Sequence, residues 1–389
     1  MPEIGRRSIP FFRPSIGDAE IEGVTAALQS GWLTTGPYTR QFETGFAAFV
    51  GVKHAIAVDS CTSALALALQ ALGASHGDEV LLPTMTFASA AAVIVHLGAR
   101  PVFVDCCAAT LRMDPDDLQH RITSRSRVVM PMHYAGQPCD MDRIFDIAHR
   151  HGLRVVQDAA HALPAEYGSS RIGSLPDVTC FSFYANKAIT TGEGGMITTD
   201  DNNLAAQMRL MAYHGISRAC TTQTGVTRPW CYEVIAPGYK RSMSDIAAAL
   251  GVQQLTRCVE FREARNRCAL RYDSGLSSLD AIRMPTVAPG MSHAWHLYVI
   301  QLNLQRLRIG RDELSDCLNE RGIGTSVHYL PLHMQTYYRQ TFGYHPGDLP
   351  CAAAAYNRIL SLPIFPSLKD EELDYTVDIL RSVLKAHRR

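Results

Sequence analysis

The stretch HAIAVDSCTSALALALQALG, residues 54–73, joins a strand pattern to a helical pattern. Its apolar first part predicts a strand, and the remainder predicts a helix that ends at Gly73. Six further short apolar runs follow, most of them separated by helix-like segments. These predicted strands are EVLLP (79–83), RPVFVD (100–105), RVVMPMH (127–133), LRVVQD (153–158), VTCFSF (178–183) and GMITTD (195–200). Strands that alternate with helices predict a mostly parallel, seven-stranded α/β sheet that is covered on both faces.

The pattern changes from about Ser244 onward. Residues 244–276 form one long helical stretch, which is followed by a predicted strand at 293–303 and by helices near 311–321 and from Lys369. This order is typical of a smaller α+β domain, with the long helix as a bridge between the two domains. We expect a large domain over residues 1–250, including an N-terminal segment, and a small domain over 251–389. Residues 221–228 are expected to form an exposed loop.

Charge and composition narrow the classes of partner. Lysine plus arginine and aspartate plus glutamate both number 37, so the formal net charge is zero. No long run of like charge is present, which argues against nucleic acid and against an anionic membrane surface as partners. The N-terminal residues lack the apolar core of a signal peptide, and no apolar stretch reaches membrane-spanning length. We therefore expect a cytoplasmic protein. The eleven cysteines include no Cys-x-x-Cys pair, so no metal site is predicted.

Lysine is rare in this chain. The lysines are Lys53, Lys187, Lys240, Lys369 and Lys385. Lys187 follows the predicted strand at 178–183, and the next carboxylate along the chain is Glu193. A lysine without a nearby ion-pair partner is a candidate for amine chemistry, because desolvation lowers its pKa and makes it a better nucleophile. The alternative is an ordinary surface lysine.

Other residues at the ends of predicted strands would suit one cofactor, pyridoxal 5′-phosphate (PLP). This cofactor needs an amine for its aldehyde, an acid for its ring nitrogen, a stacking surface and a phosphate site. Asp158 ends a strand and could serve as the acid, or it could cap the next helix. The turn at Ser60, Cys61 and Thr62 could bind phosphate at a helix N-terminus, or could be plain capping. Phe87 could stack on the ring or be a core aromatic.

Other polar residues and motifs carry weaker signals. Asp105, His133 and Ser182 also follow predicted strands and are expected near the same sheet edge. The HAWH segment, residues 293–296, does not match the metalloprotease helix motif. These features predict no additional cofactor or metal.

The order of motifs along the chain resembles the DegT/StrS-type sugar aminotransferases, which are fold type I PLP-dependent enzymes. The similar segments are SGWLTTGPYTRQFETGFAAFVGVKHAIAVDSCTSAL (30–65), DEVLLPTMTFASAAAVIVHLGARPVFVD (78–105), MHYAGQPCDMDRI (132–144), VVQDAAHALPAEYG (155–168), FSFYANKAITTGEGGMITTDD (181–201), PGYKRSMSDIAAALG (237–251) and GTSVHYLPLH (324–333). Three positions depart from the family pattern. Gln157 stands where glutamate is usual, Cys61 where glycine is common, and the segment after Tyr239 reads Lys-Arg-Ser.

This resemblance implies roles for individual residues. Lys187 would bind the cofactor aldehyde and move the substrate proton, Asp158 would pair with the pyridinium nitrogen, and His161 would lie near the phenolic oxygen. Phe87 would stack on the ring. The phosphate would be held at the Ser60 turn, by Cys61, Thr62 and Ser182. In a homodimer with shared active sites, Lys240 would reach the partner's phosphate. Substrate contacts would involve Thr34, Thr35, His328 and Tyr329.

The implied reaction is the transfer of an amino group from L-glutamate or glutamine to a keto group of a nucleotide-linked deoxysugar, in amino-sugar biosynthesis. A 4-ketosugar is the favoured acceptor. A 3-ketosugar or a keto-cyclitol is the alternative within the same fold. A PLP-binding regulatory protein without turnover is the alternative of another class, and the joint presence of Lys187, Asp158 and His161 argues against it.

Overall fold

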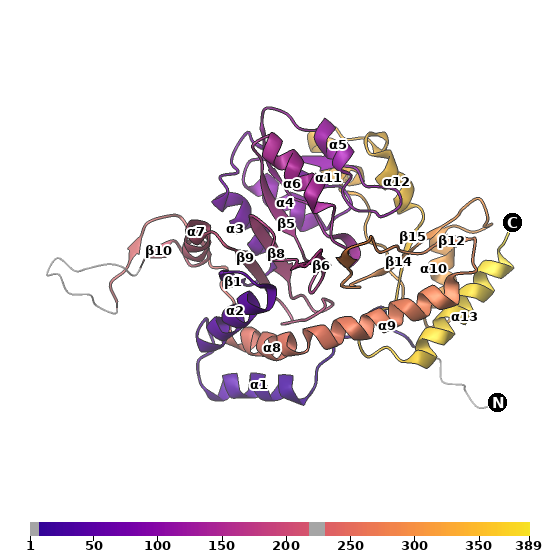
Figure 1. The fold of residues 1–389 in the computed structure, drawn as a ribbon, viewed down its shortest axis with the longest axis horizontal. Helices are drawn as coiled ribbons and strands as arrows, with labels where there is room; N and C mark the ends of the chain where they lie inside the picture. The colour runs from indigo at the N-terminus through magenta and orange to yellow at the C-terminus, as the bar shows by residue number, and fades with distance from the viewer. Residues whose placement is uncertain (1–7, 218–229) are drawn as a thin grey trace.

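A computed structural model describes residues 8–217 and 230–389, so the loop expected at 221–228 lies outside the described residues. The large domain is built on a seven-stranded sheet of order β1-β9-β8-β5-β4-β2-β3 (Figure 1). Its strands are β1 (His54–Val58), β2 (Glu79–Pro83), β3 (Arg100–Val104), β4 (Ser126–Val129), β5 (Arg154–Asp158), β8 (Val178–Ser182) and β9 (Gly195–Thr199). The predicted α/β sheet and all seven of its strands are confirmed.

Strand direction is mostly parallel, as predicted. The pairs β2–β3, β2–β4, β4–β5 and β5–β8 are parallel, whereas β9 runs antiparallel to both of its neighbours, β1 and β8. Because the turn from β8 into β9 reverses the chain directly, the segment that carries Lys187 stays at the end of β8. The C-terminal ends of β5 and β8 therefore meet at one edge of the sheet.

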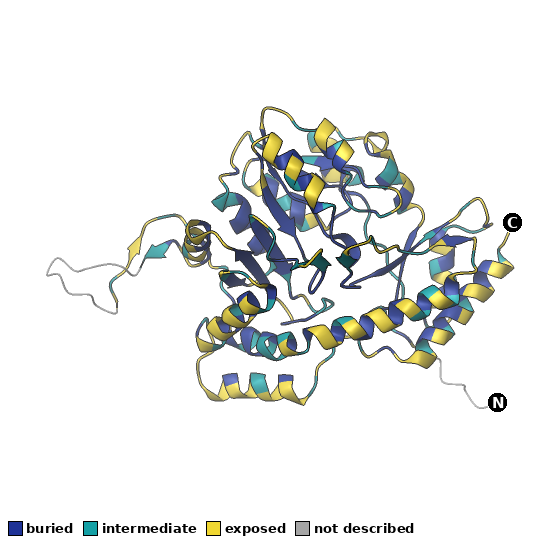
Figure 2. Ribbon diagram, in the orientation of Figure 1, coloured by how far each residue is buried: buried dark blue, intermediate teal, exposed yellow. Residues whose placement is uncertain are grey.

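Helices cover both faces of this sheet. One face packs against α3 (Cys61–Ala71), α4 (Ala88–His96) and α7 (Asn202–Ala212). The other packs against α2 (Pro37–Val50), α5 (Pro115–His120), α6 (Met141–Arg150) and α8 (Asp245–Thr256). Successive strand residues point to opposite faces and both faces are buried, so most of the strand residues are apolar. Figure 2 shows the sheet largely buried, with the exposed residues on the outer sides of the helices and in the loops.

The smaller α+β part contains the sheet β12-β14-β15, which is antiparallel throughout. Its strands are β12 (Ile282–Arg283), β14 (Tyr298–Leu302) and β15 (Ile359–Leu362), and it packs against α9 (Cys258–Leu276), α10 (Arg311–Asn319) and α13 (Asp370–Ala386). The single helix expected over 244–276 is wrong in detail. The chain leaves helical geometry at Arg257, with φ −100° and ψ 2°, so two helices lie end to end (Figure 1). Arg257 contacts Glu20 and Glu260 from this junction.

The chain crosses between the two cores more than once. Ile9 belongs to the core of the smaller part, whereas Leu332, Tyr338 and Leu349 belong to the core of the large sheet. The division into residues 1–250 and 251–389 stays a prediction. The remaining elements are α1 (Asp18–Gln29), η1 (Tyr134–Gly136), β6 (Glu166–Tyr167), β7 (Ser170–Arg171), β10 (Ile216–Ser217), β11 (Glu233–Val234), β13 (Met291–Ser292), η2 (Leu332–Met334), α11 (Thr336–Phe342), η3 (Pro346–Asp348) and α12 (Pro350–Tyr356).

Within the described ranges, every helix is too short or too polar to span a lipid bilayer. The pair β10–β11 projects from the body of the large domain (Figure 1).

Candidate active site

A cavity of about 420 Å³ lies at the C-terminal edge of β5 and β8. Ten of the residues predicted from the sequence line it: Ser60, Cys61, Thr62, Phe87, Asp158, His161, Ser182, Lys187, His328 and Tyr329. A larger groove of about 590 Å³ lies between β12 and α12, and it contains none of the predicted residues. Convergence of side chains from several separate segments, rather than size, therefore marks the candidate active site.

The order of strands in the sheet places Lys187 and Asp158 at the same edge. Asp158 is the last residue of β5, and Lys187 lies in the turn that follows the neighbouring strand β8. Burial lowers the pKa of Lys187 to about 8, although Asp158 and Cys61 oppose the change. Burial raises the pKa of Asp158 to about 6, against the effects of the Ala160 N–H and of Lys187. Such pKa shifts, in opposite directions on two neighbouring groups, are typical of catalytic sites.

The N-terminus of α3 forms the anion-binding corner of the cavity. Ser60 is the N-cap residue, and its Oγ accepts a hydrogen bond from the Ser63 N–H at 3.1 Å. Ser60 therefore does cap the helix. Cys61 and Thr62, which line the cavity, are the first two residues of α3, where the free N–H groups of a helix N-terminus favour an anion. A Cβ on Gly195 would lie 2.6–2.7 Å from backbone atoms of Ser60 and Cys61. Glycine in the GEGG segment is therefore required by the close approach of β9 to this turn.

His161 and Tyr329 form the opposite wall. His161 Nε2 lies 3.0 Å from the Tyr329 hydroxyl, while His161 Nδ1 is buried without a hydrogen-bond partner. Burial, together with the charges of Lys187 and His328, lowers the pKa of His161, so its ring is neutral at pH 7. His328 Nδ1 lies 2.8 Å from Ser361 Oγ, and burial lowers the pKa of His328 to about 4.

Phe87 is not a core aromatic. It precedes α4 and is 59% exposed, with its ring centroid 6.2 Å from that of Tyr329. A large apolar side chain that remains open to solvent beside a cavity provides a stacking surface for a planar ligand.

These groups fit PLP. The Asp158 carboxylate, 4% exposed, receives one described hydrogen bond, from the Ala160 N–H at 3.0 Å. That leaves oxygen lone pairs free for a protonated ring nitrogen. His161 Nδ1 also lacks a partner, Lys187 supplies the amine, and the α3 turn provides N–H groups for phosphate. The acid, the amine, the stacking surface and the phosphate site that the cofactor needs are therefore all present in the cavity.

Three predicted residues are not part of this cavity. Thr35 Oγ1 donates to the Met243 carbonyl at 2.7 Å, and Thr34 is exposed in the loop between α1 and α2. Lys240 Nζ donates to Ser242 Oγ at 3.0 Å and lies 4.5 Å from the centre of the Tyr213 ring. The role of Lys240 in a partner subunit's site stays a prediction.

Sequence reasoning missed some of the lining residues, namely Leu65, Ser89, Met132, Ala160, Tyr184, Asn186, Glu193 and Gly194. Tyr184, Asn186 and Glu193 are close to Lys187 in sequence, so proximity to the lysine was an available signal. Met132 had no such signal, because its place in the cavity comes from the pairing of its strand with the chain at Asp158.

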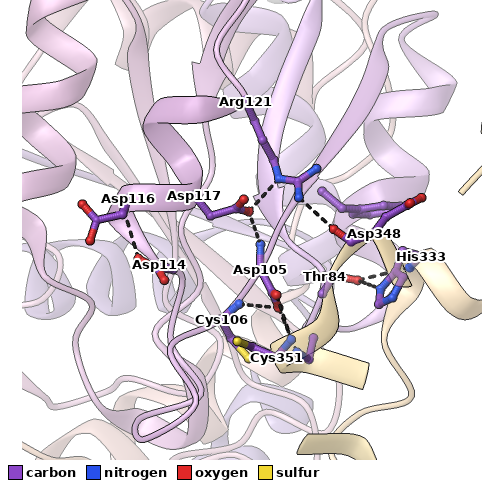
Figure 3. A network of polar contacts seen from close by, with 12 residues as sticks. Thr84, Asp105, Cys106, Asp114, Asp116, Asp117, Arg121, His333, Asp348 and Cys351 are labelled. Carbon is purple, nitrogen blue, oxygen red and sulfur yellow. Dashed lines mark hydrogen bonds and ion pairs between the residues drawn. The ribbon is translucent and has the colours of Figure 1, made fainter. Parts of the chain in front are cut away.

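Asp105 and His133, which also follow strands, have structural roles instead. The Asp105 carboxylate accepts hydrogen bonds from the backbone N–H groups of Cys106, Cys351 and Ala352, so it caps α12 (Figure 3). Thr84 Oγ1 lies 2.8 Å from His333 Nδ1 in the same network. His133 is buried behind the sheet edge, where its Nδ1 accepts from the Cys139 N–H at 3.1 Å.

An α/β sheet that carries a half-buried lysine, a buried aspartate and a helix N-terminus at one edge is typical of fold type I PLP-dependent enzymes. The family model for the DegT/DnrJ/EryC1/StrS aminotransferase family matches residues 14–381. The chain belongs to this family, its cofactor is pyridoxal phosphate, and it is an aminotransferase.

Individual relatives agree with this assignment. The chain is 46% identical to the spore coat polysaccharide biosynthesis protein SpsC of Bacillus subtilis (strain 168), over 97% of both chains. The aminotransferase TlmJ from Streptoalloteichus hindustanus is 35% identical with a TM-score of 0.89, and the match covers 97% of this chain and 99% of that one. Spr1654 from Streptococcus pneumoniae, named as a sugar aminotransferase and solved in a PLP-form, is 33% identical, with a TM-score of 0.91 and coverage of 98% and 99%.

Proposed function

We propose that this enzyme transfers an amino group from L-glutamate or glutamine to the keto group of a nucleotide-linked 4-ketosugar, in amino-sugar biosynthesis. The observation that carries the proposal is the pairing of Lys187 and Asp158 in one cavity, with their pKa values shifted in opposite directions. Family membership and the names of the relatives support a sugar as the amino acceptor.

The cofactor supplies the electron sink that lets a proton leave the carbon next to the transferred nitrogen. Asp158 would hold a proton at the ring nitrogen. Lys187 would take the proton from one carbon and return it to the next, because a lysine whose pKa is about 8 is partly neutral at physiological pH. His161 would contact the phenolic oxygen as a neutral ring, held by the Tyr329 hydroxyl. Phe87 would cover one face of the ring.

The charge of the cavity supports an active site that is completed by a second subunit. Among the described residues that line it, Lys187 is the single side chain cationic at pH 7, and Asp158 and Glu193 are the acids. His161 and His328 are neutral because burial lowers their pKa values. A phosphate and the diphosphate of a nucleotide sugar would enter this cavity without enough positive charge from one chain. Lys240 of a second copy is our candidate for the missing cation.

The first experiment follows the cofactor spectrum. The purified enzyme is expected to show the absorption band of lysine-bound PLP, and glutamate or glutamine is expected to convert it to the pyridoxamine form. Addition of a nucleotide 4-ketosugar should then restore the first band. No conversion by any amino donor would rule out the proposed function. A panel of 3- and 4-ketosugar nucleotides, with product analysis, decides the position of amination.

The shared site is tested by mixing two inactive variants. Lys187→Ala and Lys240→Ala are each expected to lose activity alone, the second through weaker phosphate binding. After dissociation and reassociation, mixed dimers would contain one intact site, so about a quarter of the wild-type activity should return. If Lys240 acts within its own chain, mixing restores nothing.

A further inference from the structure

The HAWH segment, which the reaction does not use directly, lies immediately behind His161. The rings of His161 and His296 are in tilted contact, with their centroids 4.1 Å apart and an angle of 44° between their planes. His296 is 4% exposed and is not a lining residue of the cavity. The Nδ1 atoms of both rings are buried without a hydrogen-bond partner. Two adjacent, unsatisfied imidazoles beside a cofactor site call for a functional explanation.

The backbone next to His296 is strained and firmly held. Trp295 has φ +51°, a left-handed conformation that is unfavourable for a bulky residue. Its N–H donates to His293 Nδ1 at 2.7 Å, and its indole Nε1 donates to Asn266 Oδ1 at 3.0 Å. Its carbonyl accepts from Arg265 Nη1 at 3.4 Å. Arg265 and Asn266 are consecutive residues of α9, so this helix fixes the turn that presents His296.

The same turn is fastened to the large domain on its other side. The Ala294 N–H donates to the Gly136 carbonyl at 2.9 Å, and the Leu297 N–H donates to the Ala135 carbonyl at 3.1 Å. A Cβ on Gly136 would lie 2.9 Å from the His161 carbonyl and 3.1 Å from the His296 nitrogen. Glycine at 136, where φ is +104°, therefore allows the two histidine-bearing segments to meet.

Arg265 is a buried cation without a carboxylate partner. Its side chain is 3% exposed, and Nη1 also donates to the Ile364 carbonyl at 2.9 Å, whereas Nε has no partner. None of the ion pairs among the described residues includes it. Burial lowers its pKa to about 10, so it remains charged at neutral pH. An uncompensated charge acts strongly on neighbours in a low-dielectric interior.

Other charges and titratable groups also face the two histidines. Burial lowers the pKa of His296 most, followed by the effect of His161; Lys187, which follows β8, and His328, which precedes Tyr329, also lower it. Arg265, on α9, acts in the same direction. Asp158, at the end of β5, would act in the opposite direction, and the Tyr329 hydroxyl is hydrogen-bonded to His161.

We propose that Arg265 and His296 are positioning residues for the reaction: the buried guanidinium holds the Trp295–His296 turn through the Trp295 carbonyl, and the His296 ring, packed against His161, keeps His161 directed at Tyr329. The inference rests on the proposed function only where it takes His161 as a contact of the cofactor. Arg265 is not among the residues that line the cavity, so it acts through the turn that carries His296.

The first test needs no cofactor. Histidine titrations are followed by NMR in apo-protein labelled at its histidines, with the His161 and His296 signals assigned by His161→Asn and His296→Phe. Arg265→Gln, which keeps hydrogen-bond donors without the charge, is expected to raise the pKa of His296, because the Arg265 charge is one of the groups that lower it. Arg265→Lys, which keeps the charge, should leave the His296 titration near wild type. Arg267→Gln, on the exposed side of the same helix, is the matched control. A folded Arg265→Gln protein with unchanged histidine titrations would overturn the proposal.

The second test uses the loaded enzyme. In Arg265→Gln, the kcat of the glutamate half-reaction should fall with little change in KM, because His161 is held less firmly at Tyr329, and Arg265→Lys should restore it. A purely structural role would instead lower the amount of active enzyme without this split between kcat and KM. His296→Phe keeps an aromatic ring behind His161 without its nitrogens, and we expect about a tenfold loss in kcat with little change in KM. Wild-type kcat in His296→Phe would show that only the ring's volume matters and would remove His296 from the proposal. Because the NMR titration is independent of turnover, failure of the proposed function is distinguishable from failure of this inference.

Discussion

Asp158 and Asp105 occupy equivalent places and have different chemistry. Both are buried, with 4% and 6% exposure, and both stand at the end of a strand of the large sheet. The Asp105 carboxylate accepts hydrogen bonds from three backbone N–H groups, at 2.8–2.9 Å. Those from Cys106 and Cys351 can be followed in Figure 3. The Asp158 carboxylate receives one described N–H group, from Ala160.

This difference separates a structural carboxylate from a functional one. A buried carboxylate whose lone pairs are filled by the backbone stabilises the fold and has little left to offer a ligand. A buried carboxylate whose oxygens accept few hydrogen bonds destabilises the cofactor-free protein and attracts a protonated ligand. Asp158, with a pKa raised to about 6, is of the second kind.

The largest effect is expected from Lys187→Ala, which removes the group that faces Asp158. The variant should bind no cofactor covalently, and amino transfer should fall by on the order of 10³ or more because the proton-transfer group is lost. Borohydride reduction followed by peptide mass spectrometry checks the attachment. A label retained on Lys53, Lys240, Lys369 or Lys385 would mean that the wrong lysine has been chosen.

Asp158→Asn should lower amino transfer by roughly 10²–10³, since an amide holds the ring-nitrogen proton poorly. Its effect on the empty protein has the opposite sign. The folded pKa of about 6 is above the unfolded value near 3.9, so Asp158 favours folding at low pH and disfavours it as the pH rises toward and past 6. At pH 7.5 the variant should therefore be more stable than wild type by about 2 kcal/mol, measured by urea unfolding of apo-protein. Equal or lower stability would contradict this account of Asp158.

Asp105→Asn should lower the stability and leave the activity nearly unchanged, which is the reverse of the effect expected for Asp158→Asn. The amide oxygen can still accept from two N–H groups, but its NH₂ then faces a backbone N–H at the start of α12. We expect a loss of about 1–3 kcal/mol in the free energy of unfolding, with turnover per folded molecule close to wild type. Urea unfolding and active-site titration measure the two quantities separately. A variant of normal stability and low activity would place Asp105 in the reaction.

The buried neutral histidines His133 and His293 give the fold a stability that depends on pH. Burial lowers the pKa of His133 to about 4 and that of His293 to about 3. An unfolded histidine titrates near 6.5, so the stability that these rings contribute is complete above pH 6.5 and is lost as the pH falls toward 4. For each of these two histidines, the free energy of unfolding should fall by about 1.4 kcal/mol for every unit by which the pH drops between about 6.5 and 4. Apo-protein unfolding at pH 7.5, 6 and 5 checks the slope, and His149→Gln, at an exposed site, should not change it.

Much of the fold followed from local patterns. The strands β1, β2, β3, β4, β5, β8 and β9 were predictable because each is a short apolar run bounded by turn or helix signals. The junction at Arg257 was not, because its neighbours favour a continuous helix and the break is accompanied by contacts to Glu20, far away in sequence. The stacking role of Phe87 was likewise ambiguous, because an aromatic residue at the start of a helix can point inward or outward.

The sequence by itself determined the α/β class, the lysine that is a candidate for amine chemistry and the set of motifs that define the family. Such features depend on composition and on spacing along the chain. Only the tertiary structure decided between Asp158 and Asp105, and it alone placed His296 and Arg265 behind His161. The physical reason is that pKa and hydrogen-bond satisfaction depend on burial and on donors from distant segments. No local pattern shows that α12 fills the carboxylate of Asp105 and leaves that of Asp158 for the cofactor.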